Sequence, residues 1–259
     1  VEYVQTLLKL NNDVFCEASV MPEDRRHYAN LKMLADSSGK LFFPSSTIRY
    51  KDSVSFIKNK LPSIGEVLFY DYKMAQNLRT WHPEQDIKDF YVSNPKTGAG
   101  REMAAFEVSW LSWLFGDNME VISGMQRQLS EISECTGIDD LYSFMLRHDG
   151  KTIGSVCIDV FSHKPYRYLR ISGTEGNIEF DWINNSVQVY DASANLLETF
   201  TEKDNYVEEG YTSFSAEKMY ELEIQNFFDS IQDRTLQRYC VDRDFNTLST
   251  LEKIESFQL

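Results

Sequence analysis

The stretch GAGREMAAFEVSWLSWLFGD, residues 98–117, reads as one helix with a carboxylate inside its apolar run. Residues 103–115 are apolar except for Glu107, Ser109 and Ser112. A helix that is apolar over nearly its whole surface lies inside a protein. We therefore predict that this helix is buried and that the rest of the chain folds around it.

Both ends of this helix carry the expected signals. Gly98 and Gly100 allow a tight entry turn, and Gly116 ends the helix. Glu102 lies in the first turn, where the helix dipole favours an anion.

Glu107 is the candidate catalytic residue of the helix. It lies one turn from Met103 and from Leu111, so it shares their face. An unpaired carboxylate in apolar surroundings has a raised pKa, which suits a general acid or base near neutral pH. The alternative is a structural carboxylate that is tied to Arg101, Arg49 or a backbone donor.

The composition predicts a soluble protein with a substantial core. Of the 259 residues, 42% are hydrophobic and 14% aromatic, and 40 acidic against 26 basic residues give a net charge of −14. Such an acidic chain disfavours a nucleic acid or an anionic membrane as a partner. No apolar run approaches the roughly 18 residues of a transmembrane helix, and the first residues lack the basic start of a signal peptide.

The cysteines and histidines predict neither disulfides nor a metal site. The four cysteines are far apart and never form a CxxC pair, which is typical of reduced thiols in a cytoplasmic protein. The histidines show no HxxxH or HExxH spacing, so we expect no zinc site. We expect His27, His148 and His163 to be surface residues.

The first 62 residues alternate between helices and strands. We expect helices at 2–10, 22–36 and 53–60, and buried strands at 14–18 and 40–44. This order is typical of a parallel α/β sheet, but two strands are too few for one. Residues 1–62 therefore read as the trailing part of a Rossmann-like α/β domain, and a phosphate-binding glycine loop is absent from this chain.

Residues 63–259 read as a second, α+β domain. We expect strands at 66–73, 119–125, 142–148, 152–161, 166–173, 177–182 and 186–190, and helices at 215–232 and 245–257. The HDGK turn at 148–151 joins two of these strands into a hairpin. Closely spaced strands predict a mainly antiparallel, open-faced sheet with covering helices on one face. Aromatic side chains on the strands favour a homo-oligomer through the open face.

Four strings resemble the glucose–fructose oxidoreductase and inositol dehydrogenase family of nicotinamide-dependent sugar oxidoreductases. Residues 13–50 resemble the segment with the family's Glu-Lys-Pro motif and a following Arg-aromatic pair. Residues 98–117 resemble the glycine-led helix that carries the family's His and Asp. YRYLRISGTEGNIEFDW and ELEIQNFFDSIQDR resemble the strand, turn and strand of its open sheet and the helix that follows. The resemblance begins in the last third of the family's Rossmann domain.

The catalytic positions of that family are altered here. Glu17 matches the motif's Glu, but Ala18 occupies the position of the catalytic Lys and Ser19 that of the Pro. The family's His falls on Phe106 and its Asp on Ser109. Alanine and phenylalanine cannot titrate, so the usual proton carriers are missing.

The resemblance implies an NAD- or NADP-dependent oxidoreductase acting on CH–OH groups of a sugar or nucleotide sugar. In this interpretation Glu107 is the replacement base and Glu17 contacts the cofactor. The residues expected to contact the substrate are Arg49, Tyr50, Trp81, His82, Arg101 and Ser109.

Two other classes of protein stay open. The loss of both Lys and His favours a non-catalytic relative that binds a sugar or assembles through the sheet. A purely structural, oligomer-forming domain fits less well, because the WHPEQD loop at 81–86 carries aromatic, imidazole and acidic groups together.

Overall fold

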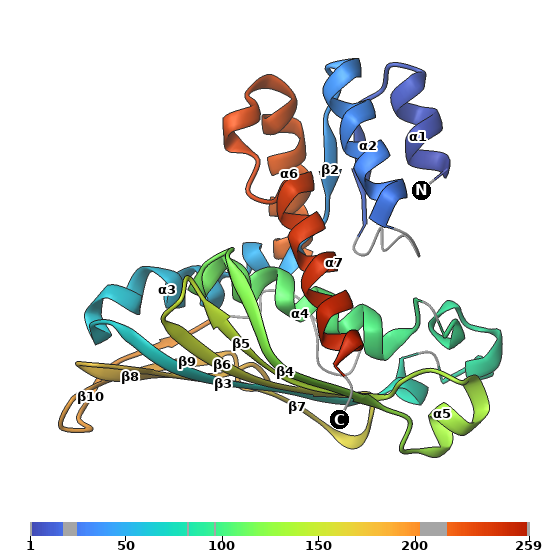
Figure 1. Cartoon of the computed structure of the whole chain (residues 1–259). Coiled ribbons are helices and arrows are strands. Elements are labelled where there is room, and N and C mark those ends of the chain that lie inside the picture. The colour runs from blue at the N-terminus through green and yellow to red at the C-terminus, as the bar shows by residue number, and fades with distance from the viewer. Residues whose placement is uncertain (1, 18–24, 82, 96, 203–216, 258–259) are drawn as a thin grey trace.

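Two packed layers, one above the other, make up the molecule in the view of Figure 1. The computed structural model describes residues 2–17, 25–81, 83–95, 97–202 and 217–257. Its helices are α1 (Glu2–Lys9), α2 (Arg25–Ser38), α3 (Asp52–Lys60), α4 (Ala99–Phe115), α5 (Glu131–Thr136), α6 (Glu217–Gln232) and α7 (Val241–Ser256). Its strands are β1 (Val14–Cys16), β2 (Phe42–Pro44), β3 (Val67–Asn77), β4 (Met119–Arg127), β5 (Leu141–His148), β6 (Thr152–Asp159), β7 (Phe161–Gly173), β8 (Gly176–Asp181), β9 (Ser186–Asp191) and β10 (Leu196–Thr201).

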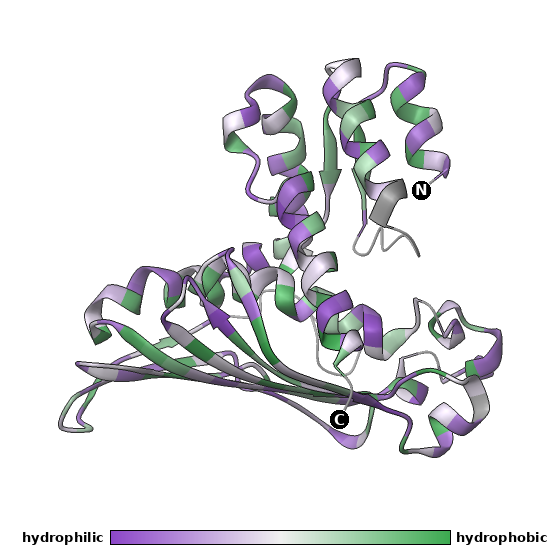
Figure 2. Ribbon diagram, viewed as in Figure 1, coloured by the Kyte–Doolittle hydropathy of each residue, from purple (hydrophilic) through white to green (hydrophobic). Residues whose placement is uncertain are grey.

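The upper layer is a short parallel sheet between helices. β1 and β2 pair in parallel, and Figure 2 shows β2 as a hydrophobic strand between helices. On one face Phe15 and Phe43 pack against Phe227 of α6, with ring centroids 5.8 Å apart in both pairs. On the other face Phe42 lies 6.4 Å from the ring of Tyr28 in α2. Both faces are thus covered, as a parallel sheet requires.

The lower layer is an eight-stranded sheet in the order β10-β9-β8-β7-β3-β6-β5-β4. Every neighbouring pair is antiparallel except β3 and β6. Helices α3, α4 and α7 lie over one face, while the opposite face carries no helix of the described chain (Figure 1). Tyr70, Tyr72 and Met74 alternate along β3 toward the helices and are buried. The α+β fold with an open-faced, mainly antiparallel sheet is therefore confirmed.

The predicted central helix is also confirmed. α4 covers residues 99–115, ends at Gly116, and buries Trp110 and Val108 completely. At Gly100 a Cβ atom would lie 1.9 Å from the backbone oxygen of Asp139, so this glycine is required by close packing. Its role is structural.

The boundary predicted at residue 62 stays a prediction. Helices α6 and α7 come from the C-terminal part of the chain but pack on the strands of the upper layer. One apolar core, which includes Val54, Tyr72 and Leu251, runs through both layers.

The hairpin at 148–151 forms as predicted, but the expected position of His148 was wrong. Asp149 and Gly150 have positive φ angles of 48° and 73° and join β5 to β6. His148 is the last residue of β5 and points to the helix side, where it is fully buried. Its Nε2 atom lies 2.8 Å from Tyr70 Oη, and its Nδ1 atom lies 2.8 Å from the Gly116 carbonyl oxygen.

His163 is exposed, as predicted, while the side chain of His27 lies outside the described residues. Cys16, Cys157 and Cys240 are free thiols. No described helix is both long enough and apolar enough to cross a membrane.

Candidate functional site

Glu107 is a fully buried carboxylate with three donors around it. Its Oε2 atom accepts hydrogen bonds from Tyr72 Oη and Trp110 Nε1, each at 2.6 Å. Its Oε1 atom lies 2.6 Å from Nη2 of Arg167 in β7. The partner is therefore neither Arg101 nor Arg49, which the sequence had suggested as alternatives. This arrangement ties α4 to the sheet; a catalytic role of Glu107 stays a prediction.

Arg167 connects Glu107 to a more open part of the molecule. Its guanidinium lies 4.4 Å from the ring of Trp182, and its side chain is 14% exposed. It also lies within electrostatic range of Tyr220 at the start of α6. Arg167 thus lies between the buried Glu107 and the groups described next.

Four titratable side chains from four separate segments lie near the junction of the two layers, close enough to interact electrostatically. We call Glu17, Tyr91, Glu102 and Tyr220 the junction cluster. Tyr91, in the short 3-10 turn Tyr91–Ser93, lies within electrostatic range of the other three members. Both tyrosines are accessible, with Tyr91 59% and Tyr220 47% exposed. The cluster therefore combines two carboxylates with two accessible aromatic rings.

Glu102 is the distinctive member of the cluster. The hydroxyl of Tyr91 donates a hydrogen bond to its carboxylate, while its Oε2 atom is buried and has no partner within the described part of the chain. Burial and the nearby Glu17 carboxylate raise the pKa of Glu102 to about 7. These two effects outweigh the helix dipole, which favours the anion at this position. Glu102 can thus exchange a proton near neutral pH.

Sequence reasoning missed this property of Glu102, although one signal was available. Glu102 precedes Phe106, the position of the family's His, by four residues. Residues at this spacing share a helix face, so Glu102 lies one turn from the lost proton carrier. The contributions of Glu17 and Tyr91 come from distant segments and could not be read from the local sequence.

Three predicted substrate residues come together in the interior. Arg49 is fully buried and donates to Ser46 Oγ at 3.2 Å, to Ser112 Oγ at 3.2 Å, and to the carbonyl oxygen of Ser109. Ser109 Oγ lies 2.8 Å from Ser46 Oγ and is likewise buried. Tyr50 donates to Asn226 Oδ1 at 2.8 Å. These contacts join the two layers, and substrate contact by the three residues stays a prediction.

The other predicted substrate residues lie elsewhere. Arg101 Nε lies 2.7 Å from Glu255 Oε1 near the end of α7, and Tyr142 donates to the same oxygen at 3.2 Å. Trp81 packs against a small apolar cluster that includes Leu78. His82 lies outside the described residues.

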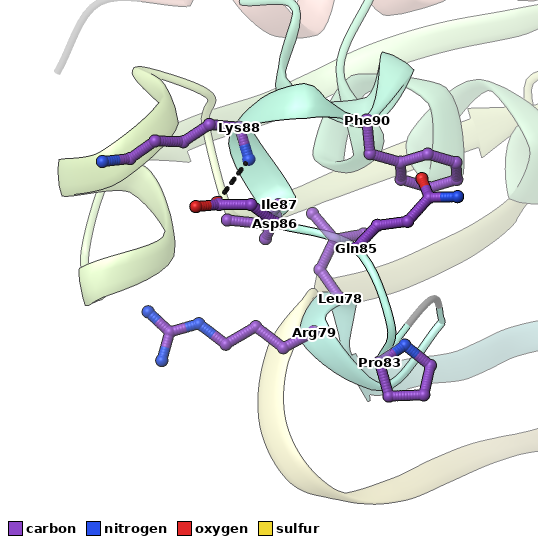
Figure 3. Close-up of a pocket in the computed structure, with 8 residues that line it drawn as sticks. All are labelled: Leu78, Arg79, Pro83, Gln85, Asp86, Ile87, Lys88 and Phe90. Atoms are coloured by element: carbon purple, nitrogen blue, oxygen red, sulfur yellow. Dashed lines mark hydrogen bonds between the residues drawn. The ribbon is translucent and has the colours of Figure 1, made fainter.

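A cavity of about 350 Å³ lies in the loop that follows β3 (Figure 3). Leu78, Ile87 and Phe90 line it together with the charged or polar residues Arg79, Gln85, Asp86 and Lys88, and with Pro83. Asp86 Oδ1 accepts a hydrogen bond of 3.0 Å from the backbone N–H of Lys88. Trp81 is not among the lining residues.

The fit of a nicotinamide cofactor can be tested on the described residues. Ligands of open α/β sheets bind at the carboxyl ends of the strands, and Glu17 directly follows β1 at that end. Glu17 is exposed and lies within electrostatic range of Glu102. The carboxyl end of β1 thus fits the reactive end of such a cofactor, while no described loop between a strand and a helix has the glycine pattern that holds its phosphates.

Solved structures share this fold over nearly the whole chain. Levoglucosan dehydrogenase in complex with NADH and levoglucosan is 15% identical, with a TM-score of 0.79 over 98% of this chain and 73% of that chain. A 3-ketoreductase from Actinomadura kijaniata in complex with NADP and TDP-benzene is 12% identical, with a TM-score of 0.76 over 99% of this chain and 74% of that chain. An oxidoreductase from Thermotoga maritima is 17% identical, with a TM-score of 0.76 over 99% of this chain and 72% of that chain. No curated protein matches the chain.

The chain therefore shares the fold of these solved structures and spans about three quarters of their length. Residues 62–179 match the GFO/IDH/MocA C-terminal domain. The resemblance to the Gfo/Idh/MocA family that was seen in the sequence is confirmed for these residues.

Proposed function

We propose that this chain forms the substrate-binding part of an NAD- or NADP-dependent oxidoreductase that acts on a sugar or nucleotide sugar. The observation that carries the proposal is the junction cluster, which gathers carboxylates and accessible aromatic rings at the carboxyl end of β1. Two of the solved structures named above support it: one contains NADH and levoglucosan, and the other contains NADP and TDP-benzene.

The residues of the cluster suit a polyhydroxylated ligand. The rings of Tyr91 and Tyr220 offer apolar faces for the C–H groups of a sugar, and their hydroxyls can donate or accept hydrogen bonds. The carboxylates of Glu17 and Glu102 accept hydrogen bonds from sugar hydroxyls. When bound, the cofactor accepts a hydride from the sugar or returns one; the chain's own groups orient the sugar and exclude water.

A non-catalytic sugar-binding relative is the second candidate. It is favoured by Phe106 at the position of the family's His and by Glu107, whose carboxylate is occupied by Tyr72, Trp110 and Arg167. In this case the same cluster would bind a sugar without turnover.

We also propose that the open sheet face forms a homo-oligomer. Phe69 and Tyr166 on this face are 37% and 46% exposed. Opposite charges alternate beside them, with Asp71 3.9 Å from Lys73 and Arg170 3.8 Å from Glu179. A face with both signs of charge can match a second copy of itself. Sedimentation should show a dimer or larger species that a Phe69→Lys variant dissociates; a monomeric wild type would refute the proposal.

Binding and turnover should be measured together to test the proposed function. The full chain is titrated calorimetrically with levoglucosan, myo-inositol and a thymidine diphosphate sugar, and each is then assayed with NAD⁺ and NADP⁺. We expect Tyr91→Ala and Tyr220→Ala to weaken sugar binding about tenfold or more, the equivalent of about 1.4 kcal/mol. Tyr166→Ala, on the open sheet face, is the matched control and should bind normally. Binding without turnover would select the non-catalytic relative, and no binding of any compound would reject both.

A further inference from the structure

Glu102 has a buried oxygen that receives no hydrogen bond from the described residues. Nearby on α4, Glu107 pairs with Arg167 and Ser109 donates to a backbone oxygen. Arg101 pairs with Glu255 through Nε, although its Nη1 atom is also buried without a partner among the described residues. Glu102 Oε2 is buried without a hydrogen bond, while the same carboxylate receives one from Tyr91. A buried polar atom without a partner costs on the order of 1–3 kcal/mol, so its retention calls for an explanation.

The position of this carboxylate supplies the explanation. Glu102 lies one turn before Phe106 on α4 and within electrostatic range of Glu17, beyond the end of β1. We propose that Glu102 is the proton-exchanging catalytic residue of this chain, taking over from the family's missing Lys and His. The inference rests on the proposed function, and a sugar hydroxyl is the partner that the Glu102 carboxylate lacks.

The proton and the hydride that leave the sugar each need an acceptor. In the oxidising direction the sugar hydroxyl would give its proton to the Glu102 carboxylate, while a bound nicotinamide would supply the hydride acceptor for the same carbon. The C–O single bond becomes a carbonyl. In the reducing direction protonated Glu102 returns its proton to the forming alkoxide. Tyr91 holds the carboxylate in place, since its hydroxyl donates to it.

The charged groups around Glu102 set the pH at which this exchange is efficient. Burial and the negative charge of Glu17 raise the pKa of Glu102 to about 7, and the hydrogen bond from Tyr91 opposes them. Tyr220 of α6 lies within electrostatic range of Glu17 and of Arg167 in β7. A general base is most efficient when its pKa lies near the working pH.

A carboxyl NMR titration tests this inference without any ligand. The full chain is labelled with ¹³C at glutamate Cδ and titrated from about pH 4 to about pH 9, with Glu102→Gln to assign the signal. We expect Glu102 to titrate near neutrality. Glu17→Gln should lower its pKa, and Tyr91→Phe should raise it further. An ordinary value of about 4.3, or no response to Glu17→Gln, would overturn the inference.

Turnover separates the inference from the proposed function. If a sugar is oxidised, Glu102→Gln should reduce kcat by about 10²-fold or more, as loss of a general base does. Glu102→Asp should retain part of the rate, and Glu17→Gln should shift the acidic limb of the pH profile downward. Wild-type turnover and an unchanged profile in Glu102→Gln would refute the role of Glu102 while leaving the function intact. If no sugar turns over, the catalytic inference falls together with the proposed enzyme.

Discussion

Replacing Glu107 by Gln tests whether this buried carboxylate holds the molecule together. The substitution keeps the volume and an oxygen for Tyr72 and Trp110, but it removes the charge that faces Arg167. Arg167 is only 14% exposed, so its guanidinium would stay buried without a counterion. Breaking a buried pair in this way costs about 3–5 kcal/mol. For a chain of this size the melting temperature should fall by on the order of 10 °C.

The assay is urea or thermal unfolding followed by circular dichroism, with Glu120→Gln as the matched control. Glu120 forms an ion pair of 2.9 Å with Arg147, but its side chain is 63% exposed. Exposed pairs contribute about 0–1 kcal/mol, so the control should unfold almost like the wild type. If Glu107→Gln lost no more stability than Glu120→Gln, the structural role of Glu107 would be refuted.

Three further substitutions give expected outcomes. Burial raises the pKa of Asp244 to about 6. The stability that its protonated form supports is therefore present below about pH 4 and falls by on the order of 3 kcal/mol as the pH rises through 6. Urea unfolding of Asp244→Asn should show no such fall over the same pH range. The pKa of Glu102 is raised to about 7, so its contribution to stability is also lost as the pH rises. Glu102→Gln should therefore match the stability of the wild type below about pH 4.5 and exceed it at about pH 8. A less stable variant at about pH 8 would contradict the burial argument. Gly100→Ala should lose about 1–3 kcal/mol in the same assay, because its Cβ would meet the Asp139 backbone oxygen at 1.9 Å, and wild-type stability would contradict this packing.

Local patterns predicted the main elements well. The apolar run of α4 and the period-two alternation of β5 and β6 are strong signals, because burial follows directly from side-chain direction. β10 escaped prediction because it is an edge strand whose residues are almost all exposed, so its sequence carries no alternation. The six-residue helix α5 is too short to show a helical period.

The partners of the buried groups could not be predicted from local sequence. Arg167 reaches Glu107 because β7 pairs with β3 beneath α4, and the two residues are 60 positions apart in the chain. Arg101, the nearer candidate, is six residues from Glu107 and lies on another face of the helix, where it pairs with Glu255. His148 was misplaced for the same reason, since only the sheet register turns a residue beside a turn toward the core.

The most direct test of a sugar site at the junction of the two layers is amide chemical-shift mapping of the full chain with levoglucosan. The account predicts shifts concentrated around Glu17, Tyr91, Glu102 and Tyr220, and their loss in Tyr91→Ala. Shifts confined to the open sheet face near Tyr166, or no shifts at all at millimolar sugar, would contradict it.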